Sequence, residues 1–354
     1  MKSEFQLRGH DRVVEKFRRA LAKERLPSTF LFVGLPGIGK RTFALKLAQG
    51  LLCDRVPEER LDPCGECSSC HQVMSLNHPD VEIVTKPADK AFIPLELLIG
   101  DAEHRMRSGL CYNIALKPYS GRRKVAIIDD ADYLNKEGAN CLLKTLEEPP
   151  PKSVLILIGT SEQRQLPTIR SRCQIVRFQP LAEGDVAELL VERGLCDDPA
   201  LARSAAAHSH GSLERAAQWC DSSLVDFHRE LIGILSQPEF DLQPTAKLIS
   251  QFVDEAGKDS AAKRKRLRLI VSLAEEFYRS ALLATETGQA SLNNESAKAV
   301  SAALRWLPAD APAACLDVCL DAYAHIDANA NQAILIESWL DELANAARTG
   351  QVPV

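Results

Sequence analysis

The hydrophobic pattern divides the chain into an alternating part and a wholly helical part. Up to about residue 180, short apolar runs alternate with stretches whose apolar residues recur at helical spacing. The apolar runs predict buried strands over 31–33, 81–84, 124–130, 153–159 and 175–178. Because a helical stretch separates most of these runs, the pattern predicts an α/β fold built on a parallel sheet with helices on both faces.

Beyond Pro180-Leu181 the pattern becomes all-α. Residues 182–222 predict three short helices, and long amphipathic helices follow from about 223 to 346 with no strand signal. We therefore expect three domains: an α/β domain over 1–181, a helical lid over 182–222 and a C-terminal helical domain over 223–354.

Length and charge limit the class of protein. A chain of 354 residues with 45% hydrophobic residues is long enough for two or three domains with cores. It shows no signal segment and no apolar run near the roughly 18 residues of a membrane span, so we expect a cytoplasmic protein that does not contact membranes. The net charge of −5 argues against general coating of duplex DNA, and the basic runs at 121–124 and 263–266 are interpreted as solvated.

The strand over 31–33 leads into a glycine-rich loop and then a helix over 39–52. The spacing Gly34…Gly39-Lys40, with Gly37 between, matches a P-loop, whose backbone N–H groups and lysine bind phosphates. This indicates a site for a nucleoside triphosphate. A Ser or Thr normally follows the lysine and binds Mg²⁺. Here Arg41 follows, and Thr42 comes one residue late, which turns its hydroxyl by about 100° around the helix. The departure is expected to impair hydrolysis more than binding.

Two carboxylates, Asp129 and Asp130, follow the run over 124–128. At the carboxyl edge of a parallel sheet beside a P-loop, the first can hold Mg²⁺ through water and the second can orient an attacking water. The second position is usually Glu in active enzymes of this class, and Asp130 is one methylene shorter. Asp130 is therefore a doubtful catalytic residue, and both aspartates could instead cap a helix.

Four of the eleven cysteines lie close together in sequence: Cys53, Cys64, Cys67 and Cys70. The C-x10-C-x2-C-x2-C spacing suits one tetrahedral Zn²⁺ in a reducing compartment. Because all four ligands would be sulfur, the zinc site over 53–70 is expected to be structural. The adjacent His71 could substitute for a ligand, but a solvated histidine is the favoured interpretation.

Several motifs occur in one order: the P-loop, the cysteine insertion, the Asp-Asp strand, Lys144-Thr145-Leu146-Glu147-Glu148-Pro149-Pro150 and Ser171-Arg172-Cys173. In this order they resemble the bacterial clamp-loader branch of the AAA+ ATPases. The resemblance is close over about 1–220 and rests on architecture and length beyond that.

The resemblance implies roles for particular residues. It makes Arg172 an arginine finger that acts in trans on a neighbouring subunit's ATP site. It makes Thr160 a polar sensor at the end of the fourth strand, and Arg215 a sensor on the lid, although a surface arginine is nearly as good an interpretation. The implied nucleotide-binding set is Gly34, Gly37, Gly39, Lys40, Arg41, Thr42, Asp129, Thr160 and Arg215.

Within this branch the chain resembles the delta-prime subfamily of DNA polymerase III more than the gamma/tau motors, because of Arg41 and Asp130. The resemblance implies structural Zn²⁺, weak binding of ATP and Mg²⁺, and a ring with gamma/tau and delta subunits. The C-terminal helices would form its collar, and the ring would place the sliding clamp on primed DNA. Two alternatives are an active gamma/tau-like motor and a stand-alone DNA-binding AAA+ regulator or helicase, although no DNA-reading module is recognisable at the C-terminus.

Overall fold

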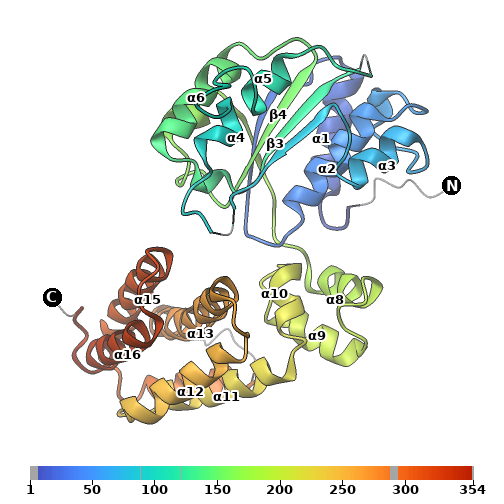
Figure 1. The fold of residues 1–354 in the computed structure, drawn as a ribbon. Helices are drawn as coiled ribbons and strands as arrows, with labels where there is room; N and C mark the ends of the chain where they lie inside the picture. The colour runs from blue at the N-terminus through green and yellow to red at the C-terminus, as the bar shows by residue number, and fades with distance from the viewer. Residues whose placement is uncertain (1–6, 88, 121, 288–293, 353–354) are drawn as a thin grey trace. The chain divides into compact units, whose positions relative to one another are not determined.

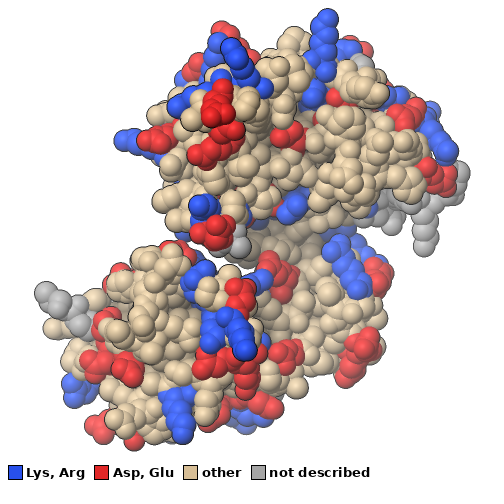
Figure 2. Space-filling view, viewed as in Figure 1, with Lys and Arg blue, Asp and Glu red and all other residues tan. Residues whose placement is uncertain are grey.

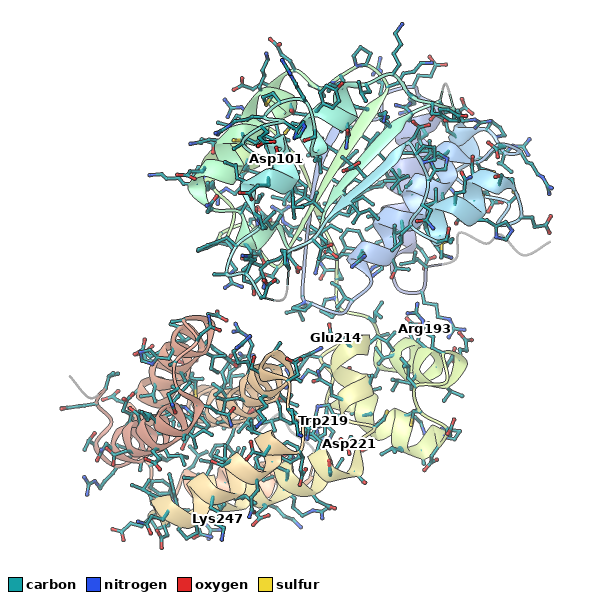
Figure 3. The ribbon with its side chains drawn as sticks, in the orientation of Figure 1. Asp101, Arg193, Glu214, Trp219, Asp221 and Lys247 are labelled. Carbon is teal, nitrogen blue, oxygen red and sulfur yellow. The ribbon has the colours of Figure 1, made fainter. Side chains whose placement is uncertain are left out.

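The computed structural model describes residues 7–87, 89–120, 122–287 and 294–352. It divides into two compact units, Met1–Cys220 and Asp221–Val354, and each is described by itself (Figure 1). Trp219 is the last residue but one of the first unit, and Asp221 is the first residue of the second (Figure 3). The first unit holds the α/β domain together with three short helices, so the division at residue 182 stays a prediction.

A five-stranded parallel sheet forms the centre of the first unit. Its strand order is β2-β3-β4-β1-β5. The strands are β1 (Thr29–Val33), β2 (Val81–Val84), β3 (Lys124–Ile128), β4 (Ser153–Gly159) and β5 (Gln174–Arg177). The predicted parallel α/β fold is confirmed. Because β4 pairs with both β1 and β3, the loops that follow these three strands meet at one edge.

Helices cover both faces of the sheet, as the pattern predicted (Figure 1). One face packs on α1 (Asp11–Ala22) and α2 (Lys40–Leu52), and the other on α4 (Leu95–Ile99), α5 (Leu110–Ala115) and α6 (Lys136–Glu147). Strand side chains alternate between the two cores, as the pleat requires. Between β1 and the first helices lies an aromatic cluster: Phe17, Phe30, Phe32, Phe43 and Phe178.

Three short helices end the first unit: α8 (Glu183–Glu192), α9 (Pro199–Ala207) and α10 (Leu213–Gln218). The side chain of Asp198 accepts a hydrogen bond from the first turn of α9, and that of Ser212 does the same for α10. Arg8 forms ion pairs with Glu188 and Glu192 of α8. These ion pairs connect the segment ahead of α1 to α8.

In the described part of the second unit, the regular elements are all helices. Its helices are α11 (Ser222–Leu235), α12 (Leu242–Asp254), α13 (Ser260–Thr287), α14 (Asn294–Ala303), α15 (Ala311–Asp327) and α16 (Gln332–Thr349). The all-α character predicted for this part is confirmed. Among the helices that the structure describes, none is both long and apolar enough to cross a membrane.

The basic run at 263–266 is less solvated than the sequence suggested. Lys263 Nζ lies 2.7 Å from Asp254 Oδ1. The guanidinium of Arg266 stacks on the Phe252 ring, 4.6 Å from its centroid. These side chains bind α13 to α12. Elsewhere on the face shown in Figure 2, basic and acidic side chains are interspersed over both units.

Candidate nucleotide and metal sites

The glycine-rich loop joins β1 to α2 and has the backbone of a phosphate-binding loop. Gly37 and Gly39 have φ of 72° and 97°, left-handed values that glycine adopts without steric cost. Gly39 is the N-cap of α2, a helix of 13 residues, so the helix's partial positive charge lies at the loop. The loop is anchored at its start, where Gly34 N–H donates to the Thr160 carbonyl at 3.1 Å. This arrangement fits phosphate groups.

Lys40 is buried at the first turn of α2 and bends back over the loop. Its Nζ donates to the carbonyl oxygens of Gly34 at 2.5 Å and Leu35 at 2.6 Å. Burial lowers the pKa of Lys40 to about 8, although the carboxylates of Asp132, Asp129 and Asp130 oppose the shift. The lysine is thus placed at the loop where a phosphate would bind.

Arg41 and Asp129 form an ion pair, with Nη1 3.2 Å from Oδ2. Asp129 is the carboxylate that the sequence assigned to Mg²⁺, and it follows β3 directly. The guanidinium therefore lies beside the oxygen that would coordinate the metal, at the position where a hydroxyl ligand would normally be. A divalent ion close to a fixed positive charge is disfavoured by Coulomb repulsion. These residues fit phosphates and do not fit Mg²⁺.

Asp130 lies two residues beyond the end of β3. Its φ of 58° opens a short 3-10 helix, Ala131–Tyr133, and its backbone N–H donates to Asp129 Oδ1 at 3.2 Å. Burial, followed by the neighbouring Asp129 charge, raises the pKa of Asp130 above its usual range. Asp130 is therefore a half-buried carboxyl beside a second carboxylate, Asp129.

Thr160 lies at the end of β4, but its hydroxyl is used within the chain. It donates to Asp132 Oδ2 at 2.6 Å, and Thr160 N–H donates to the same oxygen at 2.8 Å. Gln165 Nε2 donates to the other carboxylate oxygen at 2.5 Å. Asp132 is not among the site residues predicted from the sequence. Its signal was a third carboxylate two residues after Asp130, on the turn that follows the β3 strand.

Arg172 follows α7 (Pro167–Arg170) and contacts Glu147 of the sequence motif over 144–150. Its Nε donates to Glu147 Oε1 at 2.8 Å, and its Nη1 donates to the Thr168 carbonyl at 3.0 Å. The Arg172 side chain is 32% exposed and that of Glu147 is 49% exposed. The two sequence motifs, 144–150 and 171–173, therefore meet at an ion pair near the surface.

The first turn of α10 contacts the tip of the P-loop. Leu213 N–H donates to the Gly37 carbonyl at 3.0 Å. A Cβ added at Gly37 would lie 2.3 Å from Ser212 Oγ and 2.7 Å from the Cβ of Glu214, a residue labelled in Figure 3. Arg215 lies in this same turn, where its N–H donates to Ser212 Oγ at 3.2 Å. Thr42 lies half-buried on α2.

On the other side of the P-loop, the segment ahead of α1 packs closely. His10 is buried, and its Nε2 lies 2.6 Å from the Ile38 carbonyl oxygen. The His10 ring meets Phe178 edge-on, with centroids 5.0 Å apart. The His10 side chain therefore packs against the P-loop backbone at Ile38.

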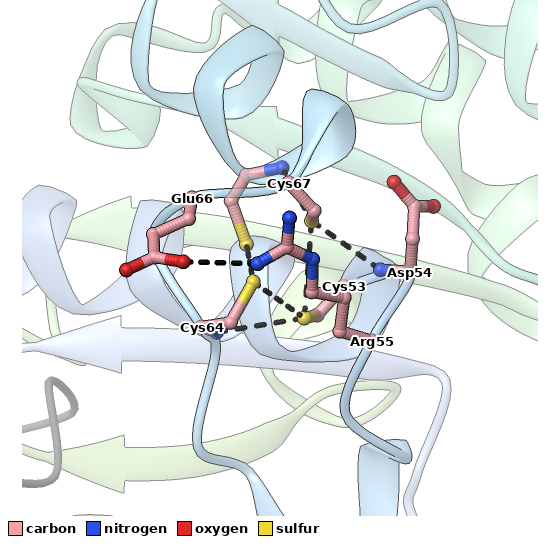
Figure 4. A network of polar contacts seen from close by, with 7 residues as sticks. Cys53, Asp54, Arg55, Cys64, Glu66 and Cys67 are labelled. Carbon is pink, nitrogen blue, oxygen red and sulfur yellow. Dashed lines mark hydrogen bonds and ion pairs between the residues drawn. The ribbon is translucent and has the colours of Figure 1, made fainter. Parts of the chain in front are cut away.

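The four clustered cysteines come together in space (Figure 4). Their sulfur atoms all lie within 4.8 Å of one another. Cys53 Sγ is 3.6 Å from Cys64 Sγ and 3.9 Å from Cys67 Sγ, and Cys64 Sγ is 4.0 Å from Cys70 Sγ. Four thiolates around Zn²⁺ at about 2.3 Å would have their sulfurs about 3.8 Å apart. The cluster could hold one metal ion of this kind.

Local structure brings the ligands together. Cys53 follows α2, Cys64 and Gly65 form a turn with φ of 72° at the glycine, and Cys67 caps α3 (Ser68–Met74). Backbone N–H groups donate to the sulfurs: Asp54 to Cys67 at 3.5 Å and Cys70 to Cys67 at 3.4 Å. Such outer contacts orient ligands and stabilise thiolates.

The thiol pKa values differ within the cluster. Burial raises the pKa of Cys53, but backbone N–H groups of Cys64, Val56 and Arg55 outweigh it and lower the pKa to about 7. Burial raises the pKa of Cys70, and the Cys67 thiol raises it further. One thiolate is therefore readily available near neutral pH, whereas the buried Cys70 favours the ionised form only with a cation beside it.

The basic run at 121–124 was predicted to be a solvated turn, and that prediction is wrong for two arginines. Gly121 lies outside the described residues. Arg123 Nε and Nη2 donate to the two carboxylate oxygens of Glu58 at 2.5 and 2.7 Å, and both side chains are about three-quarters buried. Arg122 donates to the Val56 and Asp54 carbonyls. A bidentate pair between Arg123, the residue before β3, and the 3-10 helix Glu58–Arg60 joins the cysteine module to the start of this strand.

Sequence comparisons relate this chain to known proteins. A family model described as DNA polymerase III, delta subunit, matches residues 9–182. The delta-prime subunit of Bacillus subtilis DNA polymerase III is 34% identical over 192 residues, which cover 54% of this chain and 54% of that protein. Over these matched residues the chain belongs to the bacterial clamp-loader family of AAA+ proteins.

The relatives of this chain include both delta-prime and tau/gamma subunits. The tau/gamma subunit of Haemophilus influenzae is 32% identical over 230 residues, which cover 63% of this chain and 31% of that protein. The chain thus matches about half or less of the length of these relatives. The crystal structure of a gamma-subunit-related protein from Thermotoga maritima aligns over 95% of this chain and 99% of its own, at 17% identity and a TM-score of 0.41. That score is too low to bear on the assignment.

Proposed function

We propose that this chain is a delta-prime-like clamp-loader subunit that helps place the sliding clamp on primed DNA during replication. In this proposal it occupies a ring with gamma/tau and delta subunits, supplies Arg172 to a neighbour's ATP site, and does not hydrolyse ATP itself. Three observations support this proposal: the family match, the geometry of the P-loop and the geometry around Arg172.

The Arg41–Asp129 ion pair is the observation that carries the proposal. Hydrolysis in P-loop enzymes needs Mg²⁺ to bridge the β- and γ-phosphates, with a hydroxyl and a carboxylate beside the metal. Here the hydroxyl is replaced by a guanidinium that binds the carboxylate at 3.2 Å. The water-orienting position, Asp130, has a side chain one methylene shorter than the usual Glu. Both changes act against turnover, while Lys40 and the loop geometry remain.

Arg172 has the features that a trans-acting residue requires. Its side chain is a third exposed, so a neighbour can reach it, and Glu147 holds the guanidinium in one orientation. A preorganised arginine loses less conformational freedom when it meets a developing charge. Glu147 would act as a positioning residue in this proposal.

The cysteine module would serve stability. Zn²⁺ held by four thiolates has no open position for a substrate, so its contribution is to join α2, the turn at Gly65 and α3. The bidentate Arg123–Glu58 pair would connect this module to the start of β3. A firm insertion suits a subunit that acts as a fixed part of a ring.

The alternative is an active motor like gamma/tau, and specific observations favour it. Lys40 keeps its place over the loop, and Asp129 keeps its place after β3. The Haemophilus influenzae tau/gamma relative matches 63% of this chain, against 54% for the Bacillus subtilis delta-prime relative. Against it stands the ion pair, because a motor would have to break the Arg41–Asp129 contact in order to bind the metal.

Assembly distinguishes the ring-subunit proposal from a protein that acts alone. We expect the purified chain to elute as a monomer in size-exclusion chromatography, and to shift into one larger complex when gamma/tau and delta subunits are added. A homo-oligomeric ring that forms without partners, together with no shift on their addition, would overturn the proposal and favour a stand-alone AAA+ protein.

A further inference from the structure

We propose that the P-loop of this chain binds a nucleoside triphosphate without a divalent metal ion, with the Arg41 guanidinium taking the place of Mg²⁺. The inference rests on the proposed function, because it specifies what a catalytically silent P-loop still does. It assigns the ligand as a metal-free triphosphate rather than the magnesium complex that P-loop enzymes use.

The Arg41 guanidinium lies beside the carboxylate that would otherwise hold the metal. Arg41 is the second residue of α2, and its Nη1 contacts Asp129 at the carboxyl edge of the sheet. The Asp129 side chain is 15% exposed and that of Arg41 is 44% exposed. The carboxylate is thus largely enclosed and its charge is offset by the arginine, whereas much of the arginine remains accessible from solvent.

Arginine keeps its charge at every accessible pH and presents five N–H donors in a planar fork. One edge can hold a carboxylate while another donates to a phosphate oxygen. Lys40 lies next to it on α2 and already donates to the loop carbonyls. Two cations at the N-terminus of one helix give a phosphate chain the charge that a metal ion would otherwise supply.

Three carboxylates, Asp129, Asp130 and Asp132, lie close enough to Lys40 to act on its charge. Asp132 is engaged by Thr160 and Gln165, and Asp129 is engaged by Arg41. A metal-bound nucleotide would bring two further positive charges toward Arg41, where they are repelled. The metal-free nucleotide avoids that repulsion and brings more negative charge to the two cations.

The test measures ATP binding by the full chain with calorimetry, once in EDTA and once in excess Mg²⁺. We expect the unmodified chain to bind ATP at least as tightly in EDTA as in Mg²⁺. Arg41→Thr should lose about tenfold in EDTA, the value of one charge-assisted contact, and should bind more tightly with Mg²⁺ than without it. Lys40→Ala should lose binding in both conditions.

A matched control is Arg19→Thr, which makes the same change at an arginine of α1 whose side chain is 73% exposed. Its affinity for ATP should equal that of the unmodified chain in both conditions. Circular dichroism of each variant verifies that the fold is retained.

The inference is overturned if the unmodified chain binds ATP about tenfold or more tightly with Mg²⁺, or if it shows no binding in EDTA. It is also overturned if Arg41→Thr behaves like Arg19→Thr. These outcomes are separate from the proposed function, because assembly with gamma/tau and delta subunits is read by size-exclusion chromatography, which does not depend on nucleotide binding by this P-loop.

Discussion

Replacing Arg172 with Ala is expected to lower the ATP turnover of the assembled clamp loader by about tenfold or more, because an arginine delivered in trans is worth about 10³–10⁵ in rate at the site it serves. The effect should appear only in the complete mixture of this chain, gamma/tau and delta subunits, clamp and primed DNA. The measurement is steady-state phosphate release by that mixture, with and without the substitution.

Two companion variants make this result specific. Arg177→Ala removes an exposed arginine of β5 that pairs with Glu162, and it should leave turnover unchanged. Glu147→Gln removes the charge that holds Arg172 but keeps the arginine, so the loss should be smaller than for Arg172→Ala. If the Arg172→Ala assembly forms normally and turns over ATP at the full rate, the trans role assigned to this residue is wrong.

Replacing Cys70 with Ser is expected to release the metal and to destabilise the first unit by several kcal/mol. Cys70 is fully buried, its Sγ lies 4.0 Å from Cys64 Sγ, and metal binding free energy adds to folding free energy when a site forms only in the folded chain. We expect about one zinc per unmodified chain and far less in the variant. Metal analysis and thermal unfolding followed by circular dichroism measure the two effects.

The matched control for this change is Cys141→Ser, at a half-buried cysteine of α6 outside the cluster. It should keep its zinc and unfold close to the unmodified chain. Far less than one zinc per chain in gently purified unmodified protein would remove the zinc assignment, whatever the variants do.

Much of this fold could be predicted because local patterns specify it. The β1 strand, the glycine spacing and the helix after Lys40 follow each other directly in sequence, so their geometry depends on neighbouring residues. The cysteine cluster is equally local, since four ligands within a short segment need only two turns to converge.

The contacts that decide the chemistry were harder to predict because they join distant segments. The sequence shows that Arg41 replaces the usual hydroxyl residue. It does not show that Arg41 pairs with Asp129, because that contact forms only when β4 places β1 and β3 in one sheet. Thr160 was predicted to contact the nucleotide, but in the structure its hydroxyl donates a hydrogen bond to Asp132. Arg123 carried no signal that distinguished it from a solvated residue until the cysteine module was packed beside β3.

The central claim is that this chain's own P-loop does not turn over ATP, and the steady-state turnover of the isolated chain in excess Mg²⁺ tests it most directly. The ion pair between Arg41 and Asp129 predicts a rate no higher than that of a Lys40→Ala variant measured beside it. Turnover well above that background, lost in Lys40→Ala, would show that Arg41 and Asp130 are compatible with hydrolysis and that the protein is a motor.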